Sequence, residues 1–232
     1  MAFTRTLSSQ VMNATLCHEG ISRNAVYQDY GFSNDAASHM HRRFLPSIFA
    51  LSGNLGSGLR VLDVGCGNGF TAGQFLAKGC KVVGIDLSES GIALARKTYP
   101  AGRFEVMPAD ASILANLRCD PFDLVISTEV VEHLYAPRPY AAGCFHALRP
   151  NGRFICSTPY HGFMKNMVLA MLNKWDAHAN PLWDGGHIKL WSRKTLSTLF
   201  TETGFVNLQF RGAGRVPGLW MTMVMSGDKP TR

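Results

Sequence analysis

The sequence predicts an α/β fold: a doubly wound, mostly parallel sheet of seven strands, with an antiparallel last strand. From residue 58 to residue 160, apolar strand-like runs alternate with helical patterns through short connections, which is typical of a parallel sheet covered by helices on both faces. Glycines directly follow the first strand, where the absence of Cβ atoms opens the backbone to close approach. Near the C-terminus, a short loop containing Gly212, Gly214 and Gly218 joins the last two strands, and so short a connection favours an antiparallel hairpin.

The elements are expected in a regular order. A helical pattern runs from Asp35 to about Leu51, with Asn34 and Asp35 as its cap, and the loop from Gly53 to Gly58 follows it. The alternating part comprises strands at 60–64, 81–86, 103–107, 122–127 and 152–157, and helices at 69–78, 88–98 and 137–148. The C-terminal part adds helices at 160–178 and 192–203 and strands at 205–211 and 219–226.

Composition excludes several classes of protein. With 46% hydrophobic residues the chain is typical of a globular protein, and no apolar run reaches the about 18–20 residues needed to cross a bilayer. The N-terminus lacks the unbroken apolar core of a secretory signal. The six cysteines form no close C-x-x-C pair, which favours free thiols in a reducing compartment. We therefore expect a cytoplasmic protein.

The net charge of +7 permits anionic partners without demonstrating one. The basic residues are scattered, apart from short groups such as 41–43, so nucleic-acid binding is not expected. An anionic membrane surface is equally compatible with this charge.

The most informative segment, at residues 61–70, reads VLDVGCGNGF, with glycines at 65, 67 and 69. A second apolar strand ends at Asp86. The glycines let a ligand approach the backbone, the following helix offers unpaired N–H groups, and an acid at the end of the second strand suits the two hydroxyls of a ribose. This pattern predicts a pocket for a cofactor that carries adenosine.

Two cofactors fit the glycine pattern. Gly67, Gly69 and Ala72 match G-x-G-x-x-G/A, and Asp86 lies about 20 residues further on, as in dinucleotide-binding proteins. A nicotinamide dehydrogenase or a nucleotide-binding module is therefore one alternative.

Three further features favour S-adenosylmethionine, with S-adenosylhomocysteine as product. Asp63 precedes the glycines, where a carboxylate suits an ammonium group rather than a pyrophosphate. Asp110 follows the third strand, in a position to accept a hydrogen bond from an adenine amino group. A polar segment at 127–129 follows the fourth strand, where it would line the sulfonium end.

In these segments the chain resembles the class I S-adenosylmethionine-dependent methyltransferases. The matching segments are LDVGCGNG (62–69), VVGIDLS (82–88), PADA (108–111), FDLVISTEVVEHL (122–134) and LRPNGRFICSTP (148–159). The resemblance implies that the glycines shape the cofactor pocket, that Asp86 holds the ribose, and that Asp110 and Ala111 contact adenine. The expected cofactor-binding residues are Asp63, Gly65, Cys66, Gly67, Gly69, Asp86, Leu87, Asp110, Ala111 and Thr128.

Some of these residues also have purely structural explanations. Asp63 could cap the turn, Asp110 could begin a helical turn, and Cys66 fits a small packing residue better than a nucleophile. Asp86 is the firmest assignment, because an acid that ends a buried apolar strand needs a partner.

The acceptor is expected to meet Glu129, Glu132 and His133, which we predict as the catalytic residues. If this segment is helical, the three side chains lie within an arc of about 100°. They could deprotonate an acceptor hydroxyl or hold Mg²⁺, and no metal-ligand set is assigned. The same sequence also often only lines the pocket in class I enzymes.

The later part of the chain resembles, more loosely, the ubiquinone-biosynthesis O-methyltransferases, which methylate polyprenyl catechols. His187 to Trp191 follow an apolar stretch at 163–175, as in that group, where such a stretch is associated with membrane contact. A lid over the active site explains this stretch equally well. The resemblance implies O-methylation of a small, partly apolar acceptor of the phenol, catechol or quinone-precursor type.

We expect one domain over residues 1–232, since this length suffices for a single α/β core. Its expected parts are an N-terminal helical cap (1–57), a cofactor-binding core (58–160), a lid or insertion (160–191) and a C-terminal helix with a hairpin (192–232). Tyr27 and Tyr30 of the cap are expected to help close the site. Peripheral contact with a membrane, if it occurs, is expected through residues 160–180. The sequence does not predict an oligomeric state.

A methyltransferase that acts on RNA or protein is the other alternative. An Asn/Asp-Pro-Pro-Tyr motif, typical of enzymes that methylate bases or glutamine, should follow the fourth strand, where this chain has Ser127 to Val130. This difference argues against N-methylation of nucleic acids but leaves other RNA chemistry open.

Overall fold

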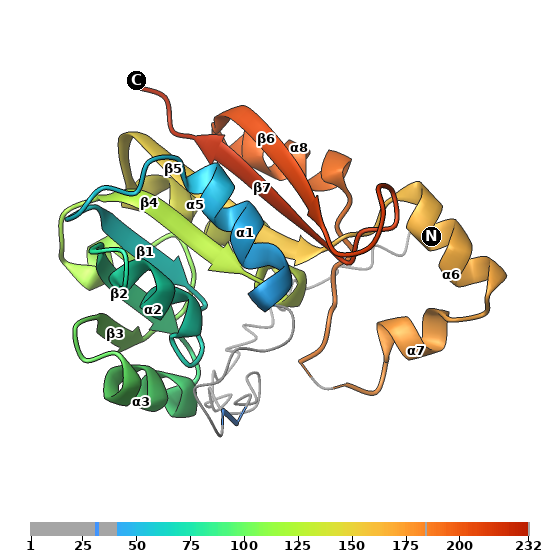
Figure 1. Ribbon diagram of the computed structural model, residues 1–232, viewed down its shortest axis with the longest axis horizontal. Helices are drawn as coiled ribbons and strands as arrows, with labels where there is room; N and C mark the ends of the chain where they lie inside the picture. Colours follow the sequence, from blue (N-terminus) through green and yellow to red (C-terminus); the bar gives the residue numbers. More distant parts are fainter. Residues whose placement is uncertain (1–30, 33–40, 184, 232) are drawn as a thin grey trace, which may run out of the picture.

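In the computed structural model, residues 31–32, 41–183 and 185–231 are described, and within them seven strands form one sheet in the order β3-β2-β1-β4-β5-β7-β6 (Figure 1). The strands are β1 (Arg60–Val64), β2 (Lys81–Asp86), β3 (Arg103–Val106), β4 (Phe122–Thr128), β5 (Leu148–Pro159), β6 (Val206–Ala213) and β7 (Thr222–Asp228). The helices are α1 (His41–Ser52), α2 (Phe70–Leu76), α3 (Glu89–Thr98), α4 (Ile113–Leu117), α5 (Pro137–Ala147), α6 (Phe163–Met171), α7 (Trp175–Ala179) and α8 (Arg193–Thr203), with a 3₁₀ turn, η2, at Val131–His133.

The topology confirms the predicted fold class. Strands β1 to β5 pair in parallel wherever they are neighbours, so their carboxyl ends reach the same edge of the sheet. Strand β7 lies between β5 and β6 and runs antiparallel to both. The short loop between β6 and β7 therefore forms the hairpin that its length predicts.

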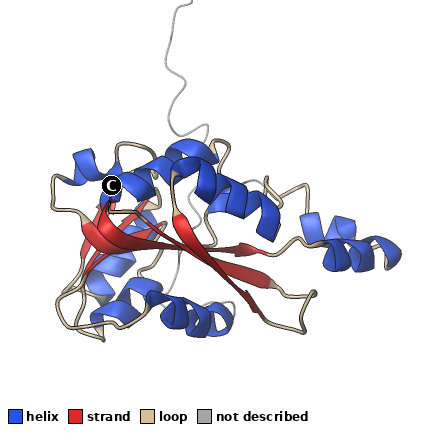
Figure 2. Ribbon diagram, turned by 90° about the horizontal axis from the view of Figure 1, so that it is seen from above, coloured by secondary structure: helices blue, strands red, loops and turns tan. Residues whose placement is uncertain are grey.

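The buried apolar side chains form two clusters on opposite faces of the sheet, as expected for a doubly wound fold. Because side chains alternate along a strand, Val61 of β1 joins one cluster and Leu62 joins the other. The cluster with Val61 includes apolar side chains of α1, α2 and α3, whereas the cluster with Leu62 includes those of α4, α5 and α8. Figure 2 shows the sheet between these two layers of helices.

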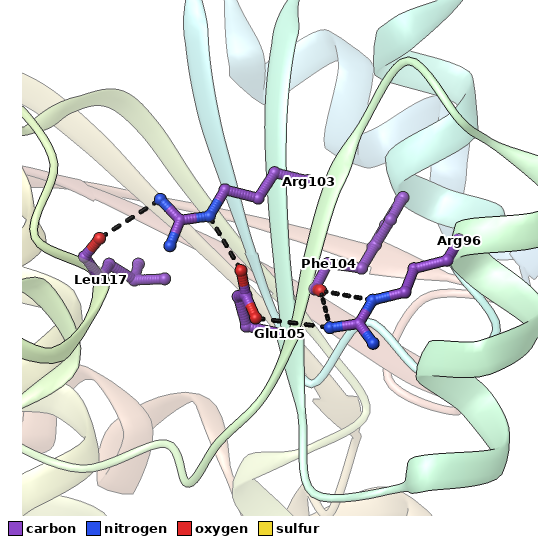
Figure 3. Close-up of polar contacts among 5 residues, drawn as sticks. All are labelled: Arg96, Arg103, Phe104, Glu105 and Leu117. Atoms are coloured by element: carbon purple, nitrogen blue, oxygen red, sulfur yellow. Dashed lines mark hydrogen bonds and ion pairs between the residues drawn. The ribbon is translucent and has the colours of Figure 1, made fainter.

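Strand β3 forms one edge of the sheet, and charged side chains protect it (Figure 3). Arg96 of α3 donates to the Phe104 carbonyl at 2.7 Å and to the Glu105 carboxylate at 3.3 Å. Arg103 donates to Glu105 at 3.0 Å and to the Leu117 carbonyl at 3.2 Å. These contacts anchor the edge strand to α3 and α4, and charges at an edge discourage pairing with another chain.

The predicted helix at 160–178 is wrong in one respect: the chain forms two short helices, α6 and α7, here. Asn173, between them, has a left-handed φ of 50°, which ends the first helix. Both views show α6 and α7 projecting beyond the main body of the sheet (Figures 1 and 2).

Other differences from the predicted elements are small. Strand β5 extends beyond the predicted 152–157 at both ends, and α4 was not predicted. Asn34, Asp35, Tyr27 and Tyr30, to which the sequence assigns a cap and a closing role, lie outside the described residues. Within the described ranges, none of the helices combines the length and the apolar character that crossing a membrane requires.

Candidate active site

The glycine loop connects β1 to α2 at the carboxyl edge of the sheet. Gly65, Gly67 and Gly69 have backbone φ values of 75°, 51° and 78°, which residues other than glycine rarely adopt. A Cβ on Gly65 would lie 2.3 Å from a methyl group of Val130, so Val130 packs directly on this backbone. The three glycines thus form a turn of left-handed backbone on which Val130 packs closely, and their role in a cofactor pocket stays a prediction.

Asp63 lies just before this turn and is fully buried. Neither of its carboxylate oxygens has a hydrogen-bond partner of ordinary geometry among the described residues. Loss of hydration, reinforced by the nearby Asp86 carboxylate, raises the pKa of Asp63 to about 7, although the backbone N–H of Ala72 opposes the shift. A buried carboxylate without a partner is unfavourable, so this arrangement suits a cationic ligand group.

Asp86 ends β2, next to β1, and its carboxylate organises the loop. Its two oxygens accept hydrogen bonds of 2.8 Å, one from the Gly67 N–H and the other from the Ser88 N–H. Ser88 in turn caps α3, because its hydroxyl accepts the Gly91 N–H at 3.0 Å. A carboxylate oxygen can accept more than one hydrogen bond, so this geometry remains compatible with ribose hydroxyls.

Asp110 follows β3 and begins the turn into α4. Its Oδ1 accepts hydrogen bonds from the Ser112 N–H at 2.8 Å and from the Ser112 hydroxyl at 2.5 Å. These contacts agree with the alternative that Asp110 begins a helical turn. Ala111 and Leu87 are exposed at the same edge of the sheet, where they could border a bound ring. The adenine-binding role of Asp110 and Ala111 stays a prediction.

Cys66 and Thr128 complete the predicted cofactor set. Burial raises the pKa of the Cys66 thiol well above its usual value, so the thiol stays protonated and acts as a packing group. Thr128 is half-buried at the end of β4. This strand pairs with β1, which leads into the glycine loop.

The helical premise for Glu129, Glu132 and His133 is wrong. Glu129 has a left-handed φ of 56°, and only residues 131–133 form a single 3₁₀ turn. The Glu129 N–H donates to the Ser157 carbonyl at 3.1 Å, and the Ser157 hydroxyl donates to Glu129 Oε1 at 2.7 Å. The end of β5, rather than a helix, therefore positions this carboxylate.

Glu129 and Glu132 lie close enough to interact. Loss of hydration raises the pKa of Glu129 to about 7, against the opposing effects of Ser157 and Lys165. Burial, and then the charge of Glu129, raises the pKa of Glu132 well above its usual value. Thr158 donates to Glu132 Oε2 at 2.9 Å, whereas Oε1 has no hydrogen-bond partner among the described residues. The pair can accept a proton near neutral pH.

His133 points toward a different neighbour, His187. The His133 Nδ1 lies 2.8 Å from the Gly185 carbonyl, and the two imidazole rings are 4.9 Å apart between centroids. The Glu132 carbonyl accepts the N–H groups of Ile188 and Lys189, both at 3.0 Å, which holds this segment against η2. One potential ligand atom each of Glu132, His133 and His187 lies within 4.8 Å of the others.

Sequence reasoning missed three contributors to this site. Ser157 ends the predicted fifth strand and Thr158 follows it, and neither is predicted to contact the acceptor, yet both donate hydrogen bonds to the glutamates. Lys165, the only buried residue of α6, was assigned to an apolar helix, yet its charge lowers the pKa of Glu129. The only feature of the sequence that could have indicated this role is that Lys165 is a single charged residue in an apolar run.

Comparisons with known proteins agree with this architecture. Residues 36–209, well over half of the 232-residue chain, match the family described as "Methyltransferase domain". The chain is 36% identical over 152 residues to a ubiquinone biosynthesis O-methyltransferase of Bradyrhizobium diazoefficiens, covering 61% of this chain and 54% of that protein. A protein of the same name from Rhodopseudomonas palustris is 30% identical over 161 residues, covering 66% of this chain and 60% of that protein. The chain thus spans about half the length of the curated relatives it matches.

Solved structures show the same fold at low identity. An S-adenosylmethionine dependent methyltransferase from Mesorhizobium loti gives a TM-score of 0.63 at 20% identity, covering 80% of this chain and 97% of that chain. Magnesium protoporphyrin IX methyltransferase from Synechocystis gives a TM-score of 0.60 at 17% sequence identity, and the match covers 80% of both chains. The family match and the fold confirm the resemblance drawn from the sequence motifs: this chain belongs to the methyltransferase domain family, whose class I members depend on S-adenosylmethionine.

Proposed function

We propose that the chain is an S-adenosylmethionine-dependent O-methyltransferase of a small, partly apolar acceptor of the phenol, catechol or quinone-precursor type. The observation that carries this proposal is the buried Asp63 carboxylate beside the glycine loop, which has no hydrogen-bond partner of ordinary geometry among the described residues, together with the Glu129 carboxylate beyond the end of β4, whose pKa is raised to about 7. The names of the relatives support the choice of oxygen as the acceptor atom.

The residues present fit the cofactor. Asp63 would pair with its ammonium group, which would supply the partner that this carboxylate lacks among the described residues. Asp86 would hold the ribose hydroxyls while it fixes the Gly67 N–H, and Asp110 with Ala111 would border adenine. When bound, the cofactor supplies a methyl group made electrophilic by the neighbouring sulfonium.

Glu129 is the group best suited to accept the proton of the acceptor hydroxyl. Its pKa of about 7 lets it act as a base at neutral pH, and the Ser157 hydroxyl fixes its position. The side chains of the site must also align the acceptor oxygen and exclude water. His133, held by the Gly185 carbonyl, would line the acceptor side.

A divalent cation would fit the cluster of Glu132, His133 and His187. A backbone carbonyl next to one ring nitrogen, as at His133, is the usual way to orient an imidazole ligand. Burial, followed by the charge of His133, lowers the pKa of His187 to about 4, so this ring is neutral, as a ligand must be. A bound cation would supply a Lewis acid for the acceptor oxygens.

Residues 160–191 are proposed as a lid that can also touch a membrane surface. Large apolar side chains of this segment are exposed, among them Phe163 at 77%, Met171 at 68% and Leu182 at 91%. Exposed apolar side chains of this kind suit an apolar acceptor or the boundary of a lipid bilayer. Sedimentation with anionic lipid vesicles tests the membrane contact, and protein that stays in the supernatant would argue against it.

Calorimetry and a methyl-transfer assay test the main proposal. S-adenosylhomocysteine is expected to bind and NAD is not, and catechol acceptors are expected to be methylated in preference to RNA or protein. Binding of NAD alone would support the dehydrogenase alternative. An activity that depends on RNA, together with strongly salt-sensitive RNA binding, would favour the macromolecular acceptor.

A further inference from the structure

Helix α6 is oriented opposite to an ordinary amphipathic helix. Its only buried residue is Lys165, which is 5% exposed, whereas Phe163 and Met164 beside it are 77% and 50% exposed. A lysine is almost never fully buried unless it has a partner, because removing an ammonium group from water is costly. The buried face of α6 thus carries a charge at a position where an apolar side chain would stabilise the fold more.

The hydrogen bonds of Lys165 do not balance this cost. Its Nζ donates to the Met221 carbonyl at 3.4 Å, and among the described residues no carboxylate oxygen lies within 4.0 Å of it. An ammonium group has three donors, so the contact with the Met221 carbonyl satisfies only one of them. Burial, and then the charge of Arg215, lower the pKa of Lys165 to about 8, while Glu129 opposes them.

The surroundings of Lys165 indicate which ligand group it faces. Its charge lowers the pKa values of Glu129, His161 and His178, so all three lie within its electrostatic reach. Loss of hydration, reinforced by Lys165, lowers the pKa of His161 to about 4, so that ring is neutral at pH 7. A cation with incomplete hydrogen bonding, next to a glutamate that can take up a proton, is complementary to an oxygen that has just lost one.

We propose that Lys165 binds the acceptor as its oxyanion, which restricts the substrates to acidic hydroxyl compounds such as phenols, catechols and enols, and excludes aliphatic alcohols. This inference rests on the proposed O-methyltransferase function. The acceptor hydroxyl gives its proton to the Glu129 carboxylate, and Lys165 keeps its own protons and donates a hydrogen bond to the oxygen. The acceptor oxygen then forms the new C–O bond as the donor's S–C bond breaks, and the electron pair of that bond stays on sulfur.

A coloured phenol tests the ionisation directly, without turnover. The absorbance of 4-nitrocatechol reports its ionised form, and we would titrate it with pH on protein saturated with S-adenosylhomocysteine, in EDTA so that no metal ion contributes. Wild-type protein is expected to lower the pKa of the bound probe by about one unit, a tenfold preference for the ionised form. Lys165→Met should abolish this shift, and Lys165→Arg should keep most of it.

Matched variants separate this role from a structural one. Lys174→Met removes the same charge from an exposed position of the same segment and should leave the shift unchanged. Lys165→Met should bind S-adenosylhomocysteine as the wild type does, with a thermal midpoint that does not fall, because methionine fills the site without a buried charge. If Lys165→Met does not fold, Lys165→Gln takes its place in the titration.

Two results would overturn the inference. One is a pKa shift in Lys165→Met or Lys165→Gln equal to that of the wild type. The other is wild-type protein that binds S-adenosylhomocysteine but shows no preference for ionised 4-nitrocatechol, or no binding of it. Failure of S-adenosylhomocysteine to bind at all would instead contradict the proposed function, so the two failures are distinguishable.

Discussion

Asp63 and Asp86 lie at the ends of neighbouring strands, yet only Asp86 has backbone hydrogen-bond donors on both of its oxygens. The Gly67 and Ser88 N–H groups donate to Asp86, whereas Asp63 is buried without a partner of ordinary geometry among the described residues. The two carboxylates therefore have different roles. Asp86 holds the loop in place, and Asp63 is available for a cation.

Asp63→Asn is expected to make the ligand-free protein more stable at pH 8. The folded-state pKa of Asp63 is raised from 3.8 to about 7, so the folded state binds more protons than the unfolded state between these values. The stability that this carboxyl contributes is thus complete below about pH 4 and is lost as the pH rises to about 7. Thermal denaturation of both proteins from pH 4 to pH 8 measures the difference.

The same substitution should weaken the binding of S-adenosylhomocysteine, because asparagine has no charge to pair with an ammonium group. For the wild type, this affinity should increase as the pH rises toward 7, and for Asp63→Asn it should change much less. Equal affinities of the two proteins at pH 8 would contradict the proposed role of Asp63. Calorimetry at two pH values gives both comparisons.

Gly65→Ala should disrupt the glycine loop. The new Cβ would lie 2.3 Å from Val130, in a backbone conformation with a φ of 75°. Gly53→Ala is the matched control, because Gly53 has a φ of 72° but, in the part of the chain that the structure describes, no neighbouring atom lies within 4 Å of such a Cβ. Both substitutions introduce left-handed strain of about 1–2 kcal/mol.

The difference between these two variants isolates the effect of the clash with Val130. Chemical denaturation should show a larger loss of stability for Gly65→Ala than for Gly53→Ala, and only Gly65→Ala should lose affinity for S-adenosylhomocysteine. Equal effects of both substitutions would show that the strain of the turn, rather than the packing of Val130 on it, matters.

His133→Ala should slow turnover far more than it weakens cofactor binding. The ring is held beside Glu132 and His187, which we propose as part of the acceptor side, so its removal should affect that side of the site. The rate on the true acceptor should fall about 100-fold or more if His133 takes part in proton transfer. His146→Ala, on an exposed position of α5, serves as the control, and an unchanged rate in His133→Ala would remove His133 from the chemistry.

The geometry of the glycine loop and its neighbouring carboxylates, which we propose to bind the cofactor, could be predicted from the sequence because it is local. The predicted bounds of β1 and β2 agree with the structure, since each strand is a short apolar run that glycines or an acid terminate. The glycines need only their own backbone conformation to form the turn. Asp63 and Asp86 then meet because neighbouring parallel strands end at the same edge.

The acceptor half depends on contacts between distant segments, and these have no local pattern. His187 lies beside His133 because the Glu132 carbonyl accepts two N–H groups from residues 188 and 189. Glu129 leaves the expected helix because Ser157, on another strand, binds both its backbone and its carboxylate. Lys165 lies in an apolar run whose pattern predicts an exposed charge, and the packing of α6 reverses this arrangement.

His187→Ala tests whether Glu132, His133 and His187 bind a divalent cation. Their potential ligand atoms lie within 4.8 Å of one another, and losing one of three protein ligands should weaken the binding of Mn²⁺, used as a probe, by about tenfold or more. Paramagnetic relaxation of water protons measures this binding in wild type, His187→Ala and the control His146→Ala. Excess EDTA should lower the methyltransferase activity of the wild type, and added Mg²⁺ should restore it. Full activity in EDTA would show that these three residues position the acceptor without a metal ion, since the loss of a required Lewis acid has to slow the reaction.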